Sequence, residues 1–272
     1  KATANGKRNK AKRLQYLLTH SFSAKAFAVR KVTTNKGKNT PGVDKKLWST
    51  SSAKMQAVLT LTDRGYRTKP LKRVYIAKKR PLGIPTMYDR AMQTLYALSL
   101  EPIAETKADN ISFGFRRSRS AKDACEQIFC VLARKCSPTW ILEGDIKGCF
   151  DNINHAWLQS NIPMDKRIMK QFLKSGFIYK GKLFPTDTGS PQGGAISSLY
   201  ANMTLDGLEK VIQEKYHRNT IGNITNHYRA KTKVNLVRYA DDFIITANSK
   251  EIAEEIKSIV SEFLKSRGLE LS

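Results

Sequence analysis

Two adjacent carboxylates, Asp241 and Asp242, stand between two short apolar runs of the sequence. Leu236–Val237 before them and Phe243–Ile245 after them favour strands, so the segment predicts a tight hairpin whose turn carries both acids. Asp is also frequent in turns for its backbone chemistry alone. Two like charges at a buried hairpin repel each other unless a cation relieves them, and a divalent metal ion is the natural candidate. The pair is therefore a candidate metal site.

A third carboxylate, Asp145, follows another strand signal, Trp140–Leu142, which we expect to be buried. Gly144 and Gly148 lie on either side of Asp145 and allow another segment to approach the backbone closely. Phe150 comes five residues after Asp145, where an aromatic ring could form the wall of a small pocket. A Phe in the core is the alternative explanation.

Two further segments could bind phosphates. Lys69–Pro85 predicts a strand, a turn rich in Lys and Arg, and a second extended piece. Cations at a projecting tip can clamp a triphosphate, although basic hairpin tips are also common on protein surfaces. Thr188–Gly194 is a Gly- and Pro-rich loop before an apolar helix that we expect over 195–211. Such a junction presents backbone N–H groups to anions or serves as a plain turn.

The positive charge is concentrated in the first third of the chain. Of 272 residues with a formal net charge of +25, residues 1–80 hold 22 Lys or Arg and 2 Asp or Glu, a net of +20. The other 192 residues hold 26 basic and 21 acidic side chains, a net of +5. A face that is merely solvated would mix the two signs, so the first third is expected to meet a polyanion. Nucleic acid is the leading partner, and an anionic membrane is the alternative.

Two segments are candidates for contact with RNA. The first is a basic region of helical periodicity near the N-terminus, whose cations could bind phosphates: Lys7, Arg8, Lys10, Lys12, Arg13, Arg30 and Lys31. The second is Ser112–Ser120, where Phe residues alternate with Arg116 and Arg117. Aromatic faces stack on bases while Arg binds phosphate, but a loop that packs two Phe rings into the core fits equally well.

The remaining composition points to an intracellular protein. The four cysteines (Cys125, Cys130, Cys136 and Cys149) have no zinc-ligand spacing, and we expect them to be reduced core residues. No segment is apolar enough over sufficient length to span a bilayer, and no signal peptide precedes Lys1. We therefore expect no membrane partner.

Four segments together resemble the motif series of reverse transcriptases, in the expected order: Arg80–Pro85, Asp145–Phe150, Ser190–Gly194 and Tyr239–Asp242. The basic N-terminus, with Ala24–Val32 and Thr40–Asp44, is similar to the group II intron maturase branch of that family. The likeness spans nearly the whole chain, and four ordered motifs are far more specific than any one of them.

The resemblance implies an α+β fold, the right-hand polymerase with fingers and palm. Residues 1–88 would form the fingers with a helical basic N-terminal extension, and 89–272 the palm, an antiparallel sheet backed by helices. A further fingers segment is expected near 153–190. The thumb, maturase and endonuclease regions of the family are expected to be absent from this stretch.

The resemblance also assigns roles to individual residues. Asp145 and Asp241 would be the metal-binding carboxylates, with Asp242 as the adjacent catalytic acid and the Ile146 carbonyl as an extra ligand. The ions would be two Mg²⁺, with Mn²⁺ as a substitute. The residues expected at the nucleotide are Lys78 and Arg80 on the triphosphate, Phe150 against a ribose 2′-OH, and Gln192 and Gly193 lining the pocket.

The activity implied is that of an RNA-directed DNA polymerase of a group II intron, which binds the intron RNA to assist splicing and mobility. Its partners would be intron RNA, an RNA template, a DNA primer and deoxynucleoside triphosphates, in a bacterial cytoplasmic ribonucleoprotein and compatible with a homodimer. A retron-type or diversity-generating reverse transcriptase is one alternative. A non-catalytic RNA-binding maturase module is another, which the intact trio Asp145, Asp241 and Asp242 disfavours.

Overall fold

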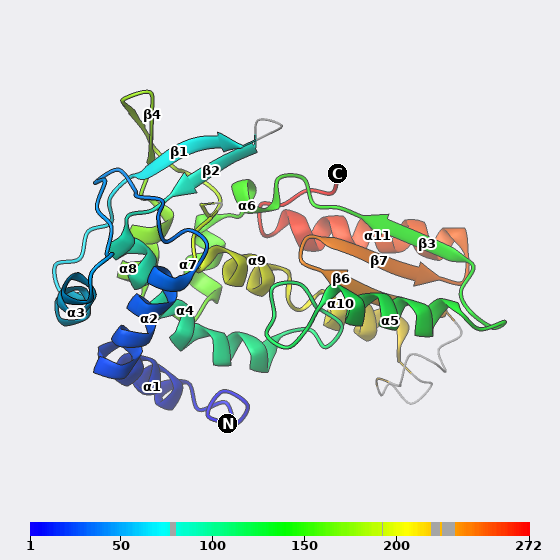
Figure 1. Ribbon diagram of the computed structural model, residues 1–272. Helices are drawn as coiled ribbons and strands as arrows, with labels where there is room; N and C mark the ends of the chain where they lie inside the picture. Colours follow the sequence, from blue (N-terminus) through cyan, green and yellow to red (C-terminus); the bar gives the residue numbers. More distant parts are fainter. Residues whose placement is uncertain (77–79, 192, 219–223, 225–231) are drawn as a thin grey trace. The chain divides into compact units, whose positions relative to one another are not determined.

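The computed structural model describes residues 1–76, 80–191, 193–218, 224 and 232–272, and its contacts divide the chain into two compact units (Figure 1). Unit 1 comprises Lys1–Thr106 and Phe150–Tyr200, and unit 2 comprises Lys107–Cys149 and Ala201–Ser272. Each unit is therefore assembled from two stretches of chain. The expected boundary between fingers and palm at residue 88 stays a prediction, and the units defined by contacts divide the chain elsewhere.

Unit 1 is a set of helices around a four-stranded sheet of order β2-β1-β4-β5. Only β1 and β4 pair in parallel; the other neighbours are antiparallel. Its strands are β1 (Leu71–Ile76), β2 (Arg80–Ile84), β4 (Phe177–Tyr179) and β5 (Lys182–Phe184). Its helices are α1 (Arg8–His20), α2 (Phe22–Thr34), α3 (Ser51–Thr60), α4 (Met87–Lys107), α6 (Cys149–Asn152), α7 (His155–Asn161) and α8 (Lys166–Leu173); the last residue of α4 and the first residue of α6 fall in unit 2.

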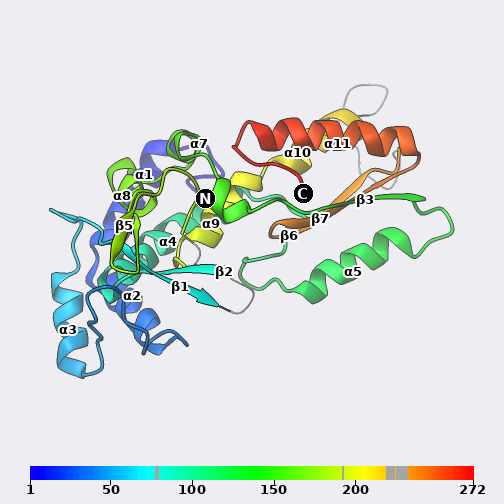
Figure 2. The same ribbon diagram turned by 90° about the horizontal axis from the view of Figure 1, so that it is seen from above.

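Unit 2 contains a three-stranded antiparallel sheet of order β3-β7-β6. In Figures 1 and 2 helix α11 lies on one face of this sheet, against β3 and β7, and α5 lies on the other face, against β6. The expected antiparallel sheet backed by helices is thus confirmed. The elements are α5 (Ala121–Leu132), β3 (Trp140–Gly144), α10 (Leu208–Tyr216), β6 (Asn235–Tyr239), β7 (Asp242–Ala247) and α11 (Lys250–Lys265); α9 (Ser197–Leu205) begins in unit 1 and ends in unit 2.

The central hairpin is confirmed, with one correction. The last pair of the ladder joins Tyr239 to Asp242, so the turn consists of Ala240 and Asp241, and Asp242 already belongs to β7. Ala240 has a φ of 58°, a left-handed conformation of the kind that a two-residue hairpin turn requires. The prediction that the turn carries both acids was therefore wrong for Asp242.

Three other expectations also change. The β3 strand is not buried, because it is an edge strand that pairs only with β7, and Trp140 and Ile141 are 42% and 50% exposed. The helix expected over 195–211 is broken into α9 and α10 at Gly207, whose φ is 98°. The cysteines are free, as expected, but three of them are exposed and only Cys149 is buried.

Among the described residues, no helix has both the length and the apolar character needed to cross a bilayer.

A buried ion pair lies at the centre of unit 2. Arg238, in β6, is fully buried, and its Nη2 donates to the Asp206 carboxylate at 2.6 Å. Burial raises the pKa of Asp206 to about 6, against the downward pull of the Arg238 guanidinium. Burial also lowers the pKa of Arg238. Each charge is therefore tolerated in the interior chiefly because the other one is present.

Removing one member of this pair should destabilise the protein. Arg238→Met should cost about 3–5 kcal/mol, because it leaves Asp206 buried without its cation. The double variant Arg238→Met/Asp206→Leu should lose less than the sum of the two single variants. Urea unfolding of all three measures this. As a control, Lys210→Met breaks the exposed pair with Glu214 and should cost under about 0.5 kcal/mol. Strict additivity in the Arg238–Asp206 cycle would contradict the prediction.

Candidate active site

The three predicted acids come from neighbouring strands of the unit 2 sheet. Gly144, the last residue of β3, pairs with Phe243 in β7. Asp145 and Asp242 are the next residues beyond that pair, so they leave the ends of adjacent antiparallel strands. Asp241 precedes Asp242 in the hairpin turn. The fit at this point is close, because a Cβ on Gly144 would lie 2.3 Å from the Phe243 ring.

The charges of the neighbouring acids act on Asp242. The pKa of Asp242 is raised, first by partial loss of water around its carboxyl group and then by the negative charges of Asp241, Asp145 and Glu143. Glu143, on β3, is a fourth acid that the sequence did not single out. Within the described part of the chain, none of these four carboxylates forms an ion pair with Lys, Arg or His. The end of the sheet therefore carries uncompensated negative charge.

The donor chemistry at this end of the sheet suits a hard divalent cation, because carboxylate and carbonyl oxygens are the ligands that Mg²⁺ and Ca²⁺ prefer. Where the structure describes side chains, it contains no group of three or more His, Cys, Asp or Glu already arranged as a metal centre. The strands therefore bring the acids to one end of the sheet, but the carboxylates are not already arranged as a complete set of metal ligands. Burial and then repulsion from the neighbouring acids raise the pKa of Asp242, and a bound cation would offset the repulsion.

The segment after Asp145 is held by the last residues of the chain. Ile146 forms an antiparallel bridge with Leu271. The hydrogen bonds of this bridge belong to the flanking residues: Lys147 N–H donates to the Glu270 carbonyl at 3.0 Å, and Ser272 N–H donates to the Asp145 carbonyl at 2.8 Å. In this arrangement the Ile146 carbonyl points away from the bridge. It is therefore not used by this pairing, which is compatible with its expected role as a ligand.

A brace fixes the turn that carries Asp241. Arg238 Nη1 donates to the Ala240 carbonyl at 3.2 Å and to Asn202 Oδ1 at 3.3 Å. Asn202 in turn donates from Nδ2 to the Gly114 carbonyl at 2.8 Å. Gly114 lies so close to the turn that a Cβ there would be 2.4 Å from the Ala240 nitrogen. Sequence reasoning missed this brace, although a charged residue inside an apolar strand run was a signal for Arg238.

The aromatic and basic loop, Ser112–Ser120, contains both buried and exposed side chains. Phe113 is buried and its N–H donates to the Arg238 carbonyl, whereas Phe115 is 58% exposed. Arg116 donates to the carbonyls of Asp109 and Ser112 at 2.6 and 2.8 Å, so it stabilises the loop itself. Arg117 is exposed. Only part of this loop is therefore available to a ligand.

The structure describes only some of the residues that are expected to bind the nucleotide. Lys78 and Gln192 lie outside the described residues, and for Arg80 only its place as the first residue of β2 is described. Gly193 has a φ of 96°, and a Cβ there would lie 2.7 Å from Cδ1 of Leu82 in β2. The glycine loop thus packs against the basic hairpin within unit 1. Phe150, in α6, is half-buried.

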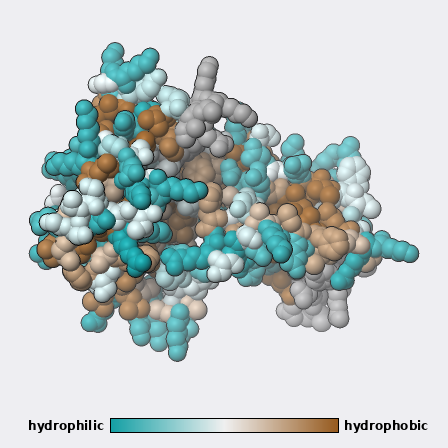
Figure 3. Space-filling model, in the orientation of Figure 1, coloured by the Kyte–Doolittle hydropathy of each residue, from teal (hydrophilic) through white to brown (hydrophobic). Residues whose placement is uncertain are grey.

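The basic N-terminal residues are exposed on or beside two helices of unit 1. Figure 3 shows hydrophilic and hydrophobic side chains interspersed over this part of the surface. The first turn of α1 carries no acidic residue, and cations near a helix N-terminus oppose the helix dipole. The stability of α1 therefore does not explain why basic residues occupy its N-terminal end. The exposed residues are Lys7, Arg8, Lys10, Lys12 and Arg13 at α1, and Arg30 and Lys31 on α2.

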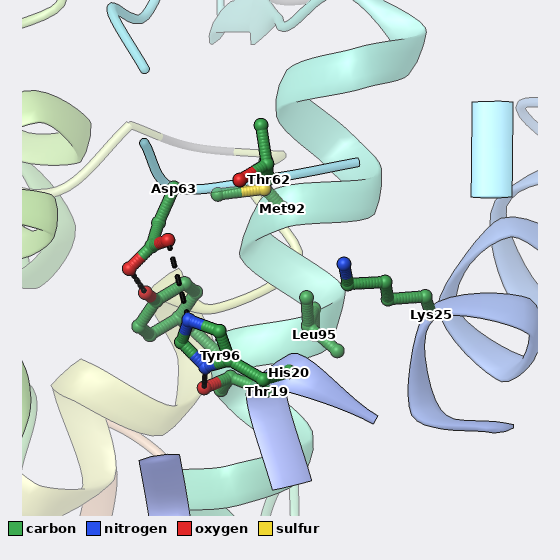
Figure 4. A pocket seen from close by; sticks show the side chains of 8 residues that line it. All are labelled: Thr19, His20, Lys25, Thr62, Asp63, Met92, Leu95 and Tyr96. Carbon is green, nitrogen blue, oxygen red and sulfur yellow. Dashed lines mark hydrogen bonds and ion pairs between the residues drawn. The ribbon is translucent and has the colours of Figure 1, made fainter. Parts of the chain in front are cut away.

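Helix α1 is fastened to the rest of unit 1 at its C-terminal end. Figure 4 shows a small pocket in which His20 and Tyr96 both reach the Asp63 carboxylate, at 3.5 and 3.3 Å. Arg167 also pairs with Asp63 at 3.5 Å, and Gln15 donates to the Pro163 carbonyl at 2.9 Å. The basic helix is consequently held in a fixed place on unit 1.

Two family models match the sequence. Residues 68–272 match the family model described as "Reverse transcriptase (RNA-dependent DNA polymerase)", and residues 1–61 match the "N-terminal domain of reverse transcriptase". Among solved structures, a chain titled "Partial Cas6-RT-Cas1--Cas2 complex" matches with a TM-score of 0.49 and 22% identity, over 93% of this chain and 41% of that chain.

Curated relatives include the "Group II intron-encoded protein LtrA" of Lactococcus lactis, 33% identical over 88% of this chain and 50% of that protein. "Protein YkfC" of Escherichia coli is 31% identical, over 89% of this chain and 74% of that protein. The chain spans about half the length of LtrA. The family model covers three quarters of the sequence, including all three acids, and the chain belongs to the reverse transcriptase (RNA-dependent DNA polymerase) family.

Proposed function

We propose that this chain carries the catalytic core of a group II intron reverse transcriptase, which copies RNA into DNA. The observation that carries the proposal is the convergence of Asp145, Asp241 and Asp242 at the ends of two paired strands, without a compensating cation in the described residues. Membership of the family supports the reaction class. The likeness to an intron-encoded protein supports the intron branch.

In this proposal Asp145 and Asp241 hold two Mg²⁺ ions, with the Ile146 carbonyl as a further ligand and Mn²⁺ as a substitute. When bound, such ions activate the 3′-hydroxyl of the primer and neutralise charge on the departing pyrophosphate. The 3′-hydroxyl would give its proton to water as its oxygen bonds to the α-phosphorus of the nucleotide, and the bond to the departing pyrophosphate would break. The protein's own contribution is to hold the acids rigidly, through the ladder between β3 and β7 and through the Arg238 brace.

The substrates would be a DNA primer, an RNA template and deoxynucleoside triphosphates. Phe150 would exclude the ribose 2′-OH, while Lys78, Arg80, Gln192 and Gly193 would hold the incoming nucleotide. The packing of Gly193 against β2 supports this assignment, because it joins the glycine loop to the basic hairpin.

We further propose that residues 1–80 bind the intron RNA mainly through its phosphates, inside a bacterial cell, and thereby assist splicing and mobility. The support is their net charge of +20 and the exposure of the cations on α1 and α2. Exposed Arg117, in unit 2, would be a separate contact with RNA, whereas Arg116 serves the loop itself. A homodimer of the full-length protein is compatible with this account.

Asp241→Asn in the full-length protein should abolish primer extension on an RNA template and leave RNA binding intact. The amide has nearly the shape of the carboxylate but lacks the charge that would hold the ion. Extension assays and filter binding measure the two properties. Asp187→Asn, which changes an exposed acid in unit 1, should leave both unchanged. Full extension by the Asp241→Asn variant would contradict the proposed mechanism.

Changing Lys7, Arg8, Lys10, Lys12 and Arg13 together to Gln should weaken binding of intron RNA and flatten its salt dependence. Each phosphate contact contributes roughly 0.7–0.9 to the slope of log K against log salt. The matched control changes five exposed Lys of α10 and α11 to Gln: Lys210, Lys215, Lys250, Lys257 and Lys265. That control should retain more of the parental affinity and slope than the α1 variant does. Parental affinity and slope in the α1 variant would show that α1 does not bind the RNA.

A further inference from the structure

The loop 188–190 and His155 hold the backbone that carries Phe150. Ser190 N–H donates to the Phe150 carbonyl at 2.6 Å, and Thr188 Oγ1 donates to the Asp151 carbonyl at 3.0 Å. Phe150 and Asp151 lie in α6, a helix of only four residues. Carbonyls at the end of so short a helix have no partner within it and must find one elsewhere. The loop supplies those partners, and we call residues 188–190 with His155 the clamp.

Gly189 is the tightest point of the clamp. Its N–H donates to the Ile153 carbonyl at 2.8 Å, and its φ is 79°. A Cβ at this position would lie 2.5 Å from the Asp151 carbonyl oxygen and 2.6 Å from the Phe150 carbonyl oxygen. Both contacts are with backbone, which cannot move aside as a flexible side chain could. The separation between the loop and the backbone of α6 is therefore set by the absence of a side chain.

His155 closes the clamp from the other side. Its Nε2 lies 2.6 Å from the Gly189 carbonyl oxygen, which can only accept, so Nε2 carries the proton and donates. The imidazole is 7% exposed, and burial lowers its pKa, which favours the neutral ring. Its Nδ1 and the Ser190 hydroxyl are buried and have no hydrogen-bond partner in the described part of the structure. His155 thus acts on the loop through a single directed hydrogen bond.

We propose that the clamp determines how strongly the polymerase prefers deoxynucleotides to ribonucleotides, by fixing the place from which Phe150 projects. The inference rests on the proposed function, in which Phe150 excludes the 2′-OH. Thr188, Gly189 and His155 are positioning residues in this account, because they act on the backbone around Phe150 and do not touch the nucleotide. The loop continues directly into Pro191–Gly193. One piece of chain therefore fixes the backbone behind Phe150 and leads into the segment proposed to line the nucleotide pocket.

The test compares addition of a single dNTP and of the matching rNTP by the full-length protein on an RNA template, as the ratio of the two kcat/KM values. Thr188→Val keeps the shape of the side chain but removes the hydroxyl that holds Asp151. It should reduce the preference for dNTP about fivefold, since the net contribution of one hydrogen bond corresponds to a factor of roughly that size. Gly189→Ala alone should reduce the preference for dNTP more than Thr188→Val does. Phe150→Ala, which removes the wall itself, should give the largest reduction.

Two controls accompany these variants. Thr188→Ser retains the hydroxyl and should keep the parental ratio. Thr186→Val makes the same change two residues upstream, at a side chain without a hydrogen bond to α6 in the described part of the structure, and should also keep it. A merely structural role of Thr188 would lower the melting temperature and both kcat/KM values together, and would leave their ratio unchanged.

The outcomes separate the two claims. A parental ratio in Thr188→Val, beside a reduced ratio in Phe150→Ala, would overturn the role of the clamp alone. An equal reduction in Thr186→Val would also overturn it, because the effect would then not depend on the hydrogen bond to Asp151. A parental ratio in Phe150→Ala, or a parent protein that adds no nucleotide, would overturn the proposed sugar exclusion or the proposed polymerase, and the clamp's role with it.

Discussion

Repulsion among like charges at the ends of β3 and β7 is the constraint on which the rest of unit 2 depends. Asp145, Asp241 and Asp242 lie near one another because two antiparallel strands end together, and their charges add to the effect of burial in raising the pKa of Asp242. A flexible turn would relax by moving the acids apart. The structure instead keeps them close, at a cost in stability that a bound cation would offset. Holding the acids in place is therefore the main task of the surrounding residues.

The hydrogen bonds of Arg238, which we call the Arg238 brace, hold the turn that carries Asp241. Its guanidinium joins the Asp206 carboxylate, the Asn202 side chain and the Ala240 carbonyl, and so links α9 and the residue after it to the turn. A buried charge of this kind is a poor source of stability compared with apolar packing. Its value here is directional, because one guanidinium holds the Ala240 carbonyl while it also binds Asn202 and Asp206. In unit 1 the clamp acts on Phe150 by a comparable means, with backbone carbonyls as its targets.

The sequence predicted the elements whose signals are local. The hairpin around Asp241 could be located from the two apolar runs that flank the acids. The contacts between segments far apart in sequence could not. The closeness of Gly114 to Ala240 joins residues more than a hundred positions apart, and no periodicity reveals such a contact. The exposure of β3 was missed for a related reason, because an apolar run does not tell whether its strand lies at an edge.

The central claim is that the acids at the ends of β3 and β7 bind a divalent ion. Titrating the full-length protein with Mn²⁺, and following free Mn²⁺ by electron paramagnetic resonance, tests it without any need for catalysis. The parent should bind Mn²⁺ saturably, and Mg²⁺ should compete. Asp145→Asn and Asp241→Asn should each weaken binding about tenfold or more, because even the loss of a group that only supports a ligand costs roughly 10–100-fold in metal affinity. Binding of Mn²⁺ by both variants with parental affinity would contradict the account.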